Sequence, residues 1–167
     1  MFRNFLLSAA MTLVATVTFA APVFPPVEIE DLNERTVALP AGLPGKATVV
    51  FLAYSRAHQA DVENWIASMR GTMEFVQIPV LGRGAGLMRG MINGGMRDGM
   101  NNPDLQGRTF NFYQSASTLN DPLEVANDSV VQVFVVLRSG EVVWSTAGQV
   151  SQAGLDGLVA AYNGANR

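Results

Sequence analysis

The sequence predicts an α/β fold in which helices pack against a central sheet. Residues 48–52 and 130–137 are two almost continuous apolar runs rich in β-branched residues, which is typical of strands covered on both faces. Residues 62–69 and 155–162 instead place their apolar side chains at i, i+3, i+4 and i+7, which is the pattern of one helix face. Strands and helices therefore alternate along the chain.

Residues 1–20 are typical of an export signal. A short start with one arginine, Arg3, precedes an apolar run over residues 5–19. The small residue Ala20, followed by Ala21 and Pro22, predicts cleavage between Ala20 and Ala21. We therefore expect a periplasmic protein in which residues 21–167 form a single domain. Membrane association is expected only if the signal stays uncleaved.

The composition excludes some classes of partner and of chemistry. The chain has 11 Lys and Arg against 14 Asp and Glu, so its net charge is −3. An acidic chain offers no broad basic surface to a phosphate backbone, so nucleic acid is not expected as a partner. The 49% of hydrophobic residues predicts a folded chain. Because the chain contains no cysteine, no disulfide stabilises it and its core must do so alone.

The first half of the fold is predicted to begin with a β-hairpin. Residues 27–32 alternate apolar and polar side chains, and residues 33–40 supply a turn and a second short strand. A loop over residues 41–46 leads to the apolar strand 48–52. Ser55 is expected to cap the next helix, which Gly71 ends.

Residues 73–81 are then predicted to return as a strand. A strand, a helix and a second strand in succession predict a parallel pair. Pro79 places the end of this strand near an edge or a bend, because proline cannot donate to a ladder.

Residues 82–129 form a predicted insertion that is unusually rich in methionine and glycine. The spacing of apolar residues from Leu87 to Met100 is helical, but each interior glycine costs a helix about 1 kcal/mol relative to alanine. Such a helix needs packing partners to persist. Residues 101–129 are expected to form a long connection with one alternating piece at residues 109–113.

The last third of the chain is predicted to form a hairpin and a closing helix. Residues 130–137 are a strand, 138–141 a tight turn and 142–145 the antiparallel return. Ser151 is expected to cap the helix that follows.

This order of elements resembles the thioredoxin-like superfamily, with an additional N-terminal hairpin as in its peroxiredoxin and TlpA branch. Residues 31–50 and 133–148 carry the likeness. The resemblance implies a thioredoxin-like three-layer sandwich with an N-terminal β-hairpin and a Met/Gly-rich helical insertion. It establishes no activity by itself.

The resemblance also implies where a redox site would lie. The Cys-x-x-Cys motif of the superfamily falls on residues 57–60, which here read Ala57-His58-Gln59-Ala60. The usual cis-proline falls near Gln132, where the chain has no proline. Without sulfur, neither thiolate attack nor a resolving disulfide is possible. We therefore expect a redox-inactive protein that is not an enzyme and needs no cofactor.

Within the superfamily the chain is similar to the assembly factors of the mitochondrial F-type ATP synthase. The likeness rests on Glu63-Asn64-Trp65, on Leu87-Met88-Arg89-Gly90 and on residues 135–144. In that family the domain is a non-catalytic chaperone for a membrane subunit. The resemblance implies an assembly or chaperone role toward a protein partner of the cell envelope, such as a membrane protein subunit.

The partner is expected to bind at the former mouth of the redox site and at the methionine-rich insertion. The predicted binding residues are Tyr54, Arg56, His58, Gln59, Asp61, Met88, Met91 and Met96. His58 is the only histidine, and it lacks a positioned catalytic partner in the sequence. We expect it to be exposed or to cap the helix.

An alternative hypothesis is a periplasmic copper carrier. Thioether sulfurs suit Cu(I), so Met88, Met91, Met96 and Met100 could bind it together with the imidazole of His58. Adaptable apolar packing explains the same methionines and is the more frequent use of such a stripe. A thiol-independent enzyme has no set of residues behind it.

Overall fold

The structure is a computed structural model that describes residues 21–167, so the predicted signal lies outside the described residues. In chain order the elements are β1 (Val27–Glu30), β2 (Thr36–Leu39), β3 (Ala47–Ala53), the 3-10 helix η1 (Arg56–His58), α1 (Gln59–Ser68), β4 (Phe75–Pro79), the 3-10 helix η2 (Arg83–Met88), α2 (Arg89–Gly99), α3 (Pro103–Gln106), α4 (Ser117–Asn120), β5 (Gln132–Leu137), β6 (Val142–Ala147) and α5 (Gln152–Ala165). Among the helices of residues 21–167, none is long and apolar enough to span a bilayer.

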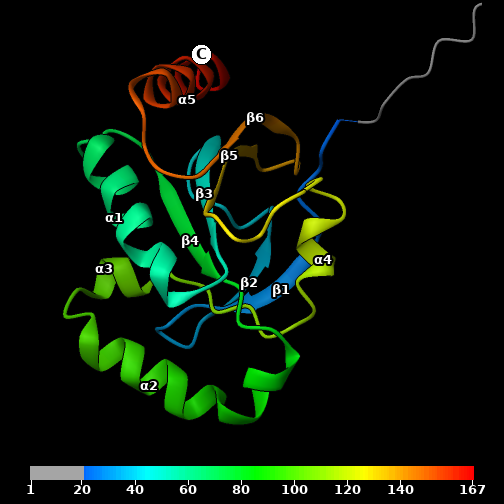
Figure 1. Cartoon of the computed structure of the whole chain (residues 1–167), viewed down its shortest axis with the longest axis vertical. Coiled ribbons are helices and arrows are strands. Elements are labelled where there is room, and N and C mark those ends of the chain that lie inside the picture. Colours follow the sequence, from blue (N-terminus) through cyan, green and yellow to red (C-terminus); the bar gives the residue numbers. More distant parts are fainter. Residues whose placement is uncertain (1–20) are drawn as a thin grey trace, which may run out of the picture.

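The central sheet has four strands in the order β4-β3-β5-β6 (Figure 1). β3 and β4 are parallel, which confirms the prediction from the strand-helix-strand order. β5 runs antiparallel to both β3 and β6, and Val135 lies opposite Trp144 in the predicted hairpin. At the turn of that hairpin Gly140 has φ +92°, and an added Cβ would lie 2.8 Å from the carbonyl oxygen of Phe24. Only glycine fits there.

Both faces of the sheet are covered, because successive side chains of a strand point to opposite sides. From β3, Val49 and Phe51 join Trp65 of α1 and Leu158 of α5 in one apolar cluster. Val50 and Leu52 join a second cluster with the β1–β2 hairpin, α4 and residues 110–123. In Figure 1 α1 and α5 lie on one side of the sheet, and β1, β2 and α4 lie on the other. These layers confirm the predicted three-layer sandwich.

The alternating piece at residues 109–113 completes the sheet. The amide of Phe110 donates to the carbonyl of Gln77 at 2.9 Å, and the amide of Phe112 donates to that of Pro79 at 2.8 Å. Asp31, just after β1, bridges Phe110 from the other side. The segment therefore covers the outer edge of β4 and links it to the N-terminal hairpin.

The two predicted helix caps have different outcomes. Ser151 Oγ accepts a hydrogen bond of 3.1 Å from the amide of Gly154, so this cap is confirmed. Ser55 precedes η1 but accepts no capping hydrogen bond, so that prediction is wrong. The chain enters η1 as a 3-10 turn, and the amide of His58 bonds the main-chain oxygen of Ser55 instead.

Candidate functional site

The position where the resemblance places the Cys-x-x-Cys motif lies at the surface, where β3 passes into η1 and α1. Ala57 is in η1 and Ala60 is in the first turn of α1, as the alignment with the superfamily implied. Both residues are exposed. Their side chains are methyl groups and the chain has no cysteine, so thiol chemistry cannot occur at this point.

His58, between the two alanines, is buried with an exposed fraction of 6%, so the expectation of an exposed side chain is wrong. It occupies the N-cap position of α1, but its side chain makes no capping hydrogen bond. Its Nδ1 accepts a hydrogen bond of 3.1 Å from the amide of Tyr54. Its Nε2 lies 3.0 Å from the main-chain oxygen of Ser129 and donates to it. The imidazole thereby joins the end of β3 to the segment before β5, which is a structural role.

The side chain of Tyr54 lies beside this imidazole. Its hydroxyl donates to Asn120 Oδ1 at 2.7 Å, and its ring meets that of His58 edge to face, with 6.3 Å between centroids. Burial raises the pKa of the Tyr54 phenol, and the negative charge of Asp128 adds to the effect. Tyr54 therefore supports the packing of α4 rather than presenting its hydroxyl to a partner.

The raised pKa predicts a loss of stability in alkali. In the unfolded chain the phenol ionises near its ordinary pKa of 10.0, whereas in the folded protein it stays neutral to higher pH. Ionisation above about pH 10 therefore favours the unfolded chain, and the free energy of unfolding falls as the pH rises further. We expect the urea midpoint of the protein to fall between about pH 9 and about pH 11. Tyr54→Phe should make this fall smaller. An equal fall in the variant would show that Tyr54 does not contribute.

The insertion helix α2 is held to the body mainly by polar contacts and buries none of its residues. Asn93 Oδ1 accepts hydrogen bonds from the hydroxyl of Tyr113 at 2.7 Å and from Nδ2 of Asn111 at 2.8 Å. Near its C-terminal end, Arg97 pairs with Glu34 of the N-terminal hairpin at 2.5 Å. These contacts fix one side of α2 and leave another side free.

The free side of α2 faces the start of α1 across an open groove of about 920 Å³. The apolar residues that line it are Ala53, Val62, Pro79, Leu81, Met91, Ile92, Met96, Met100 and Leu105. Its polar lining residues are Ser55, Arg56, Gln59, Gln77, Asn101 and Asn102, and Gly95 and Gly99 complete it. α1, α2 and α3 all contribute lining residues, and Figure 1 shows α2 at the bottom of the view, α1 above it and α3 beside them.

The groove unites half of the predicted binding residues. Arg56 and Gln59 line it from η1 and α1, and Met91 and Met96 line it from α2. The other predicted residues, namely Tyr54, His58, Asp61 and Met88, are not among those that line it. The binding role of these eight residues stays a prediction.

Other groove residues were missed by the sequence reasoning. Leu81 follows β4, Ile92 lies in α2 and Leu105 in α3. Leu81 could have been predicted to lie near residues 54–56, because the segments that follow two parallel strands meet at the same end of a sheet.

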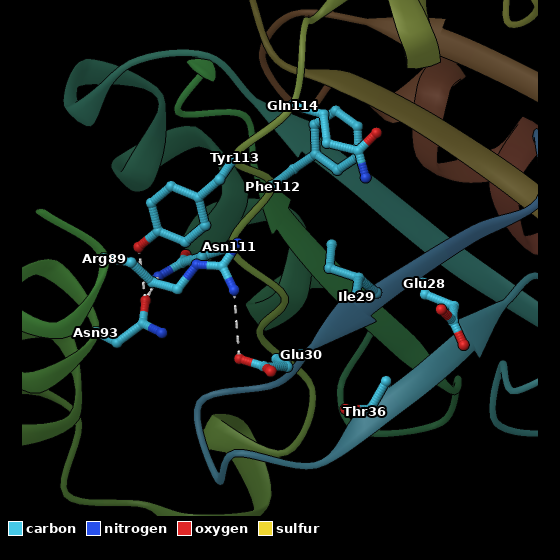
Figure 2. A pocket seen from close by; sticks show the side chains of 10 residues that line it. All are labelled: Glu28, Ile29, Glu30, Thr36, Arg89, Asn93, Asn111, Phe112, Tyr113 and Gln114. Carbon is cyan, nitrogen blue, oxygen red and sulfur yellow. Dashed lines mark hydrogen bonds and ion pairs between the residues drawn. The ribbon is translucent and has the colours of Figure 1, made fainter. Parts of the chain in front are cut away.

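A second, smaller pocket of about 230 Å³ lies between α2 and the N-terminal hairpin (Figure 2). Arg89 reaches toward Glu30, with 3.6 Å between their charged atoms, and its guanidinium carbon lies 4.9 Å from the centroid of the Tyr113 ring. Figure 2 shows Tyr113 and Asn111 both bonded to Asn93. Since these polar groups bond mostly to one another, the pocket acts chiefly as the attachment of α2.

The structure does not favour the copper hypothesis as stated. Both ring nitrogens of His58 bond to main-chain atoms, so the imidazole has no free lone pair for a metal, and its predicted role as a ligand is wrong. Met88 does not line the groove that Met91 and Met96 share. Met91, Met96 and Met100 do share the groove, so a thioether site without His58 stays a prediction.

Comparisons with known proteins bear on the fold alone. No protein-family model and no curated protein matches the chain. Its structure is similar to that of the pneumococcal exposed lipoprotein thioredoxin of Streptococcus pneumoniae, with 12% identity and a TM-score of 0.56 over 84% of this chain and 99% of the other. A thio-disulfide isomerase of Thermus thermophilus has 20% identity and a TM-score of 0.53 over 86% and 97% of the two chains.

A third similar structure is BsSco, a member of the Sco family of cytochrome c oxidase assembly proteins. It has 9% identity and a TM-score of 0.58 over 87% of this chain and 94% of the other. Identities this low show a shared fold and no shared activity. The chain therefore has the thioredoxin-like fold that the sequence predicted, and the similarity to ATP synthase assembly factors stays a prediction.

Proposed function

We propose that this thioredoxin-like chain is a redox-inactive binding module that assists the assembly of a protein partner in the cell envelope. The observation that carries the proposal is the apolar groove between α2 and the start of α1. It lies beside the position of the absent thiols. A protein with this surface and no cysteine can hold a partner without exchanging disulfides with it.

The chemistry of the groove supports this role. Methionine side chains are flexible and polarisable, so they adapt to varied apolar surfaces. Met91 is 66% exposed, although it belongs to the apolar wall of the groove. Apolar surface left open beside polar rims is typical of interaction sites.

The envelope location rests on two supports. The predicted export signal at residues 1–20 directs the chain out of the cytoplasm. Two of the similar structures carry names that fit this setting, one as an exposed lipoprotein and the other as an oxidase assembly protein. Both supports fit an exported protein that assists the assembly of a partner in the cell envelope.

Site-specific crosslinking in living cells tests the proposal. A photoreactive amino acid at Met91 should crosslink to one envelope protein, because this side chain lines the groove. Met88 provides the matched control, since it is also an exposed methionine, 50% accessible, but does not line the groove. We expect a specific adduct from position 91 that is absent or much weaker from position 88, detected by mass spectrometry.

Two results would count against the proposal. Equal adducts from both positions would show that the groove is not the binding surface. No adduct from position 91, together with normal growth and envelope composition after deletion of the gene, would remove the assembly role.

A further inference from the structure

We infer that the groove receives an apolar helix of the partner and that this helix carries a carboxylate that pairs with Arg56. The inference rests on the proposed function and specifies the chemistry of the partner. Three features of the groove support it: its charge, the pairing of the nearby sheet edge, and the glycines of α2.

Among residues 21–167, Arg56 is the only charged residue that lines the groove. It is exposed, and within residues 21–167 it forms no ion pair. Neither acid of α1, Asp61 or Glu63, lines the groove, and Glu63 accepts a hydrogen bond of 2.9 Å from Gln59. Beside an apolar wall, the attraction between the guanidinium of Arg56 and a carboxylate is stronger than in water. The positive charge of Arg56 also disfavours a partner that places a cation there.

The sheet offers no free edge to an extended segment in this groove. Gln77 and Pro79 of β4 line the groove, but their main-chain groups already bond to residues 108–112. An extended peptide would bring unpaired amides and carbonyls onto an apolar wall, which is costly. A helix satisfies its own main chain and can place an apolar face in a groove.

The glycines of α2 suit close packing of such a helix. Gly95 and Gly99 lie one turn apart and both line the groove. A Cβ added at either would meet no heavy atom within 4 Å, so the packing of this chain does not require them. Glycine weakens a helix relative to alanine, yet it lets a second helix approach closely, as small residues do at helix interfaces.

Peptide binding to the purified protein tests whether Arg56 pairs with a negative charge of the partner. The probes are three fluorescent Leu/Ala helices of about four turns that differ only in one residue, which is Glu, Gln or Lys. By anisotropy, we expect the Glu peptide to bind about fivefold more tightly than the Gln peptide, and the Lys peptide to bind most weakly. Arg56→Glu should reverse the order of the Glu and Lys peptides. Arg70→Gln, two residues beyond the C-terminal end of α1, should leave the order unchanged.

A pair of adjacent glycines tests the close approach of the helix. Gly94 and Gly95 are both interior to α2, and an added Cβ meets no heavy atom within 4 Å at either position. Gly94→Ala and Gly95→Ala should both raise the urea midpoint slightly. Only Gly95→Ala should weaken binding of the Glu peptide, by about fivefold, because only Gly95 lines the groove.

Several outcomes would overturn the inference. Equal affinity for the three peptides, or no reversal by Arg56→Glu, would refute the pairing of a partner carboxylate with Arg56. Undiminished binding of a Glu peptide with a central proline would show that the bound segment does not need to be a helix. If the peptides fail while neutral phosphatidylcholine vesicles bind, the groove takes lipid. A specific crosslink from Met91 combined with any of these results would leave the proposed function standing and refute only this inference.

Discussion

His58→Ala is expected to lower the free energy of unfolding by about 3 kcal/mol, which urea denaturation would measure. The imidazole is buried and accepts from the amide of Tyr54 while donating to the main-chain oxygen of Ser129. Its removal leaves one donor and one acceptor of the main chain unpaired, and each such group costs about 1–3 kcal/mol when buried. The cavity adds to this loss.

A neighbouring hydroxyl provides the comparison for His58. Tyr54→Phe removes only the hydrogen bond to Asn120, so we expect a loss of about 1 kcal/mol. If His58→Ala costs no more than about 0.5 kcal/mol, the side chain behaves like an exposed residue and its structural role is refuted. Because both nitrogens are engaged, the outcome also bears on every hypothesis that uses His58 as a ligand or a base.

The sheet could be predicted because its strands leave a strong signal in the sequence. β3 and β5 are buried on both faces, so almost every residue in them is apolar. α1 shows its buried face through Val62 and Trp65, and Met69 at its C-cap continues the helical spacing. Burial in the core requires apolar side chains at these positions, so the sequence itself shows which residues are buried.

The contacts of residues 109–113 and of His58 could not be predicted in the same way. The alternation of residues 109–113 indicates a strand but does not say which edge it joins, because pairing with β4 depends on main-chain atoms that every residue has. His58 is likewise held by two main-chain atoms, one of them 71 residues away. No side-chain pattern marks such partners.

The composition of the groove could be predicted only in part, for a geometric reason. The sequence suggested one helical stripe that includes Met88, Met91 and Met96. Residues Arg83–Met88 form a 3-10 helix, and α2 begins only at Arg89. Met88 ends that 3-10 helix and is the N-cap residue of α2, and its φ of −108° and ψ of 13° are not helical, so the helical spacing of Met91 and Met96 does not extend back to it. The wall opposite α2 comes from strand ends distant in the sequence.

Met91→Asp is expected to weaken partner binding by about 30-fold or more, equivalent to about 2 kcal/mol, with little effect on folding. The new carboxylate would lose its hydration when an apolar segment fills the groove, and a buried charge without a partner is costly. Since Met91 is 66% exposed in the free protein, the free energy of unfolding should change by less than about 0.5 kcal/mol. Met88→Asp adds the same charge outside the groove and should leave binding within about twofold. The affinity of each purified variant for the captured partner measures both effects. Equal weakening by the two substitutions would indicate a general effect of negative charge on this segment and would contradict binding in the groove.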